Sequence, residues 1–159
     1  MGAVTVGQGK VFHLTRTTTF GILHNPSTMN WKLIFRLSLF GLAMAVATVY
    51  WIPSKIEPLF WLVIFLFVAW TIAKQCTGKY FMHGFMVSMV NAVWIMAAHI
   101  LLAKTYLANH PEEAKMFTGT ALAVHPRLSM LIVGPIAGAV FGVILGLFCW
   151  VASRIVKKK

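Results

Sequence analysis

Four apolar segments, separated by polar connections, dominate the pattern of the chain; they cover residues 33–51, 59–73, 80–103 and 128–152. A helix of about 20 apolar residues crosses the roughly 30 Å of hydrocarbon in a bilayer. Within that hydrocarbon only helices and closed barrels satisfy their own backbone hydrogen bonds. The pattern therefore predicts an all-α polytopic integral membrane protein, with four transmembrane helices in an antiparallel bundle.

The remaining sequence divides into an N-terminal arm and short connections. Residues 1–29 are rich in threonine and glycine, contain no acid and show no sustained period. We expect them to form a flexible arm or a start-site extension, with the four-helix domain over 30–159. In the longest connection, an asparagine, a proline and two glutamates predict a short helix over 111–117, since these residues favour a helix start.

The charge distribution predicts the orientation in the membrane. Of the 14 Lys and Arg, ten lie around the start of the first span, between the second and third spans, or after the fourth. The three acids, Glu57, Glu112 and Glu113, lie in the other two connections. Because basic residues concentrate on the cytoplasmic side, both termini are expected there, in a multi-pass protein of a bacterial inner membrane. The net charge of +11 then reflects topology, and the partner it implies is the lipid bilayer rather than nucleic acid.

The fourth span contains glycines at every fourth position: Gly134, Gly138, Gly142 and Gly146. At 3.6 residues per turn these four residues, here called the glycine row, share one face of the helix. In a bilayer such a face lets a second helix approach backbone to backbone. The pattern predicts a helix-packing surface of the glycine-zipper type. Its partner is left open between the first span, a second copy and another membrane protein.

The third span alone carries a series of polar residues at depth, namely His83, Ser88, Asn91 and His99. A polar side chain in hydrocarbon needs a partner, so packing between helices explains these residues, and the lining of a solute path is the alternative. His83 and His99 are too far apart along one helix, at about 24 Å, to bind one metal or one haem together.

Candidate chemistry is sparse. On the side opposite the termini, His110, Glu112, Glu113 and His125 are the weak candidates for metal ligands, but their spacing matches no compact motif. The sequence contains no aspartate and no phosphate-binding loop, zincin motif or nucleophile elbow. We therefore expect no catalytic residues and no cofactor, and hence no enzyme.

A strong packing motif beside few reactive groups favours a non-enzymatic accessory, assembly or scaffold subunit. Such a subunit would dock through the glycine row, either in a homo-oligomer or with another membrane protein. The alternative is a small oligomeric transporter or channel with a polar path along the third span, through His83, Ser88 and Asn91.

Overall fold

The computed structural model describes residues 28–117 and 126–156, and all regular structure in these ranges is helical. Four of its helices are long and apolar enough to cross a membrane. They are α1 (Trp31–Tyr50), α2 (Glu57–Gln75), α3 (Tyr80–Leu101) and α6 (Pro126–Ile155). The predicted all-helical class, with four apolar helices of spanning length, is confirmed. The predicted N-terminal arm lies outside the described residues, except for its last two.

Two short helices, α4 (Ala103–Asn109) and α5 (Pro111–Phe117), follow α3. The predicted short helix corresponds to α5 and is confirmed, whereas α4 was expected to be part of a loop. Helix α2 is longer than the predicted 59–73. It begins at Glu57 because Pro58 is accommodated in a first helical turn, where its missing N–H has no helical acceptor.

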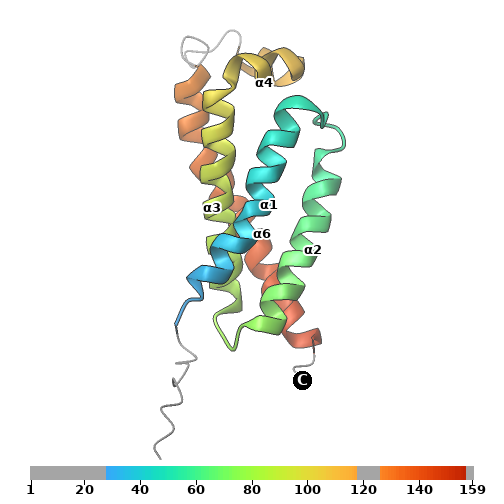
Figure 1. The fold of residues 1–159 in the computed structure, drawn as a ribbon, viewed down its shortest axis with the longest axis vertical. Helices are drawn as coiled ribbons and strands as arrows, with labels where there is room; N and C mark the ends of the chain where they lie inside the picture. Colours follow the sequence, from blue (N-terminus) through green and yellow to red (C-terminus); the bar gives the residue numbers. More distant parts are fainter. Residues whose placement is uncertain (1–27, 118–125, 157–159) are drawn as a thin grey trace, which may run out of the picture.

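The long helices are arranged around α3, which packs against both α6 and α1, while α2 packs mainly against α6. The α1–α2 connection and α4 lie at one end of the molecule, and the α2–α3 connection and the end of α6 lie at the other (Figure 1). We call the half with α4 and α5 the loop half, and the half with the start of α1 and the end of α6 the terminal half.

The buried apolar core occupies the terminal half. It joins the start of α1, the end of α2, the first turns of α3 and the end of α6. Its most deeply buried members, each with no exposed surface, are Ile34, Val68, Ile72, Val87, Leu145 and Cys149. The buried residues of α2 all lie in this half, so α2 is held to the other helices there, and room is left beside its first turns.

Large apolar side chains cover the outside of the long helices. Half-exposed or more exposed residues include Phe35, Leu39, Leu59, Val63, Ile136 and Val140. A water-soluble protein rarely exposes such a continuous apolar surface. On helices of spanning length this surface is the part that faces lipid, as expected for a multi-pass membrane protein.

Candidate functional site

His83 joins the beginnings of α1 and α3 in the terminal half. Its Nε2 accepts a hydrogen bond from the backbone N–H of Asn30 at 3.0 Å, which fixes the proton on Nδ1. Nδ1 lies 2.9 Å from the carbonyl oxygen of Lys79, to which it can donate. Because both ring nitrogens have a protein partner and the side chain is only 2% exposed, the ring serves to hold two helices together.

Ser88 and the glycine row lie at the contact between α3 and α6. The Ser88 hydroxyl donates to the carbonyl oxygen of Gly138 at 3.1 Å. Every glycine of the row lies against a side chain of α3, so a Cβ added there would meet one of four residues. In order from Gly134 to Gly146 they are Met96, Ala92, Phe85 and Phe81. Within this chain the glycine row therefore packs against the third span, which was not among the three partners considered from the sequence.

Asn91 is the buried polar side chain of α3 that has no matching partner. It is 3% exposed, and its Oδ1 accepts no hydrogen bond. The amide lies tightly against Gly41 of α1, where only the absence of a side chain leaves room for it. An unpaired amide of this kind costs about 1–3 kcal/mol. Because an unpaired polar atom in the middle of a membrane span is unfavourable, Asn91 is a candidate for binding a ligand.

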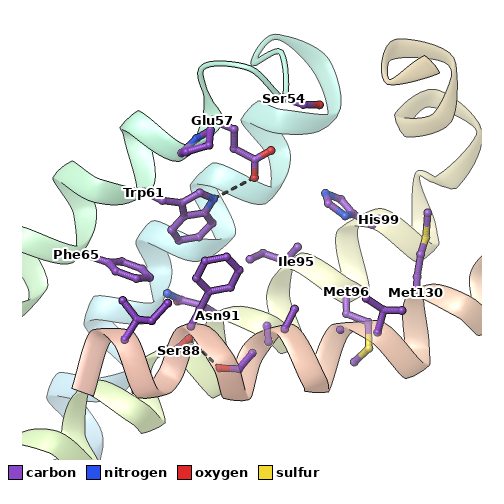
Figure 2. Close-up of a pocket in the computed structure, with 18 of the residues that line it drawn as sticks. Ser54, Glu57, Trp61, Phe65, Ser88, Asn91, Ile95, Met96, His99 and Met130 are labelled. Atoms are coloured by element: carbon purple, nitrogen blue, oxygen red, sulfur yellow. Dashed lines mark hydrogen bonds between the residues drawn. The ribbon is translucent and has the colours of Figure 1, made fainter. Parts of the chain in front are cut away.

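Asn91 also lines a cavity of about 650 Å³ between α2, α3 and α6 (Figure 2). The walls are mostly apolar and aromatic, with Trp61 and Phe65 from α2, Ile95 from α3 and Ala137 from α6 among them. Helix α1 contributes no lining residue. The volume and the few polar groups among apolar walls are typical of a site for a small molecule.

The cavity opens sideways between α2 and α6. Leu62, Val133 and Phe141 line it and are nevertheless 46%, 54% and 51% exposed. These three residues therefore form its rim on the lipid-facing surface of the bundle. A hydrophobic molecule can reach the cavity from the bilayer without passing through water.

In the loop half the cavity ends at a polar mouth, formed by Ser54, Glu57, Tyr106 and Glu113. The indole N–H of Trp61 donates to Glu57 Oε1 at 3.0 Å (Figure 2). Burial, reinforced by the carboxylates of Glu113 and Glu57, raises the pKa of Tyr106 to about 12. Burial alone would raise the pKa of Glu113, but hydrogen bonds from Ser54 and the helix backbone, together with His110, lower it below its ordinary value.

His99 and His110 flank Tyr106 in a stack of three rings beside the mouth. The ring centroids of His99 and Tyr106 are 4.0 Å apart, and those of Tyr106 and His110 are 4.5 Å apart. The His110 nitrogens lie 3.0 Å and 3.3 Å from the carbonyl oxygens of Tyr106 and Ile52. The stack thereby fixes α4 against α3 and the α1–α2 connection.

The weak metal candidates do not converge in the part of the chain that the structure describes. His110 directs both ring nitrogens at carbonyl oxygens, and Glu112 pairs with Lys115 at 2.9 Å. Glu113 belongs to the mouth, and His125 lies outside the described residues. Residues 28–117 and 126–156 contain no group of three or more His, Cys, Asp or Glu that could hold a metal ion.

The structure thus separates the predicted polar series of α3. Ser88, Asn91 and His99 line the cavity, whereas His83 does not. The sequence also drew no attention to Trp61, Tyr106 or Glu57 as site residues. One signal was available for them, because Glu57 and Trp61 are four residues apart and hence on one face of a helix.

Comparison with models of protein families, with curated proteins and with solved structures finds no match for this chain. What the cavity does is therefore argued from its geometry alone.

Proposed function

We propose that this chain is a non-enzymatic membrane protein that binds a largely apolar small molecule in the cavity between α2, α3 and α6. The observation that carries the proposal is the cavity of about 650 Å³ with mostly apolar walls, which is lined at mid-span by Asn91, whose buried Oδ1 has no hydrogen-bond partner. This oxygen lies against Gly41 of α1. A ligand with a hydrogen-bond donor would pair with it once the side chain turns from Gly41 toward the cavity. A plain hydrocarbon chain would not, which separates a specific ligand from a lipid tail.

The proposal includes a topology. We infer an antiparallel bundle with both termini on the cytoplasmic side, which places the mouth at the opposite face of the membrane. Basic residues at the terminal half support this orientation, among them Lys32, Lys74 and Lys79, because positive charge is retained in the cytoplasm. Reporter fusions at the two ends and in the α1–α2 connection test it. Activity of a periplasmic reporter at either terminus would contradict it.

The accessory-subunit interpretation remains a prediction, but it needs a different docking surface. The glycine row lies against α3, so a partner protein would have to bind another exposed apolar face of the bundle. Transport also remains a prediction. Of the residues expected to form its path, Ser88 and Asn91 line the cavity. Flux of the bound molecule out of reconstituted vesicles would favour transport over simple binding.

Photolabelling tests the binding proposal directly. A long-chain alcohol with a photoreactive group in its tail is irradiated with the protein in nanodiscs, and labelled residues are mapped by mass spectrometry. We expect labels on Ile95 and Phe65, which line the cavity. Their yield should be roughly tenfold lower in Ala137→Phe, whose ring takes up part of the cavity between them. The matched control is Val140→Phe, on the same helix but outside the cavity and 56% exposed.

Two results would overturn the proposal. One is labelling of the cavity at no higher yield than labelling of the lipid-facing residues of α6. The other is equal cavity labelling in the wild type and in Ala137→Phe. This comparison requires that Ala137→Phe and Val140→Phe unfold within a few degrees of the thermal midpoint of the wild type.

A further inference from the structure

Among the described residues, the mouth of the cavity is lined by two carboxylates and by no Lys or Arg, and the basic group that acts on it is His110, which lies behind Glu113. The two carboxylates are those of Glu57 and Glu113. The hydrogen bonds that these carboxylates accept from other side chains come from neutral groups, the Trp61 indole at 3.0 Å and the Ser54 hydroxyl. By contrast, the neighbouring Glu112 pairs with Lys115 at 2.9 Å, outside the cavity.

Two like charges at the edge of a low-dielectric cavity produce a focused negative potential. The surroundings of Glu113 lower its pKa, which keeps this carboxylate ionised at neutral pH. Trp61 and Tyr106 add aromatic rings next to the carboxylates. Aromatic faces attract organic ammonium groups, in addition to the attraction of the carboxylates. The mouth therefore has the chemistry of a site for an organic cation.

We propose that the ligand is an elongated amphiphile with a single cationic amine or ammonium head group, which lies at Glu57 and Glu113. Its apolar body lies in the cavity and carries a hydrogen-bond donor at the depth of Asn91. This inference rests on the proposed function. Asn91 precedes His99 by eight residues, so it lies about 12 Å deeper along α3. A ligand that reaches from the mouth to Asn91 is thus elongated, with its charged end at the membrane surface.

The same charges argue against the commonest amphiphiles of a bilayer. A phospholipid with an ammonium group carries a phosphate beside it, and that phosphate would lie near two carboxylates. A fatty acid would present its own carboxylate there. Like charges held close together disfavour such a complex. The mouth therefore selects a free hydrophobic amine over the lipids that surround the protein.

Matched photoprobes test the head group. Three probes share one photoreactive tail and differ only in ending with a trimethylammonium, a hydroxyl or a sulfate group. In nanodiscs made from an uncharged bilayer lipid, we expect the ammonium probe to label Ile95 and Ala137 at roughly tenfold higher yield than the sulfate probe. A difference of this size is within the attraction that two partly exposed carboxylates provide. The hydroxyl probe should fall between them.

The double variant Glu57→Gln, Glu113→Gln removes the charge while glutamine keeps an oxygen for Trp61 and Ser54. In this variant the labelling yield of the ammonium probe should fall to that of the hydroxyl probe, and the labelling yield of the hydroxyl probe should stay as in the wild type. Glu112→Gln alters a carboxylate outside the cavity and serves as the control. It should leave the labelling yields of both probes unchanged. A thermal unfolding midpoint like that of the wild type shows that the double variant is folded.

Three outcomes would overturn the inference. Equal cavity labelling by all three probes would refute the cationic head group while leaving the proposed function intact. A zwitterionic phospholipid that copurifies with the protein and resists displacement by the ammonium probe would assign the mouth to a lipid instead. Absence of cavity labelling by every probe would refute the proposed function itself.

Discussion

Gly41 of α1 and Asn91 of α3 are in direct contact, with no space for a side chain at position 41. A Cβ added to Gly41 would lie 2.8 Å from the Cβ of Asn91 and closer still to its amide. Asn91 belongs at once to the α1–α3 contact and to the wall of the cavity. The packing of α1 therefore determines where the unpaired amide is placed.

The first prediction concerns this contact. Gly41→Ala should destabilise the fold by about 1–3 kcal/mol, because an overpacked site forces neighbouring groups to shift. Denaturation in mixed detergent micelles measures the change. Adding Asn91→Ala to Gly41→Ala should restore part of the loss, since it removes the obstructing amide. Ala43→Val, on an exposed position of the same helix, is the control. A double variant no more stable than Gly41→Ala would contradict the explanation.

The second prediction compares two glycines of the row. A Cβ at Gly138 would lie 2.5 Å from the Cβ of Ala92, which cannot move aside, whereas one at Gly134 would lie 3.2 Å from the flexible Met96 sulfur. Gly138→Ala should therefore cost about 1–3 kcal/mol, and Gly138→Leu more. Gly134→Ala should be near neutral, because alanine is the better helix former. Equal unfolding midpoints for the two alanine variants would show that α3 does not pack there as described.

The third prediction concerns His83. In His83→Phe the partly buried backbone N–H of Asn30 loses its acceptor, and the loss of this hydrogen bond costs about 0.5–1.5 kcal/mol. Hydrogen exchange followed by mass spectrometry should show faster exchange at the start of α1, with the loop half unchanged. His99→Phe, at the opposite end of α3, should leave the start of α1 protected. Unchanged protection in His83→Phe would mean that the hydrogen bond does not hold the two helices.

The fourth prediction is a gain of stability. Asn91→Leu replaces an unpaired buried amide by an apolar side chain of similar size, so the empty protein should become more stable by about 1–3 kcal/mol. The same substitution should weaken labelling of the cavity by the long-chain alcohol. A loss of stability would mean that the amide has a partner within the folded protein, and would remove the main argument for a ligand.

The fifth prediction concerns pH. The pKa of Tyr106 rises from 10.0 to about 12 in the folded protein, so its neutral form is favoured there. The stability that this provides is complete below pH 10 and is lost as the pH rises through about 12. Absorbance titration should show a late tyrosinate phase near pH 12, absent in Tyr106→Phe. That variant should also retain more of the packing of α4 at high pH, as measured by hydrogen exchange.

The fold class could be predicted because each span carries its own signal, an apolar run of membrane length. Helix α5 was likewise predictable from residues within it, such as Pro111 and Glu112. The contact of the glycine row with α3 was not, because the spacing on one helix defines a surface but not the helix that covers it. Phe81 and Phe85, which cover half of the row, are four residues apart and hence on one face of α3, but this spacing does not identify the helix against which that face packs.

The site was predictable only in part, for a related reason. Asn91 stands out as an amide at mid-span, but the mouth combines residues from separate connections. Glu57 of α2 and Glu113 of α5 line the same mouth, and no local pattern reports this. Helix α4, which brings in Tyr106, has no side-chain cap at its start, so its beginning could not be predicted.

The arrangement of the glycine row against α3 also determines the order in which the protein can assemble. Since synthesis runs from the N-terminus, α3 leaves the ribosome well before α6. Until α6 follows, the Phe81, Phe85 and Ala92 face of α3 has no matching surface to pack against. The most extensive helix contact of the molecule is thus the last to form. A nascent chain that stops short of α6 is an incomplete bundle, recognisable to the cell by the bulky, unmatched side of its third helix.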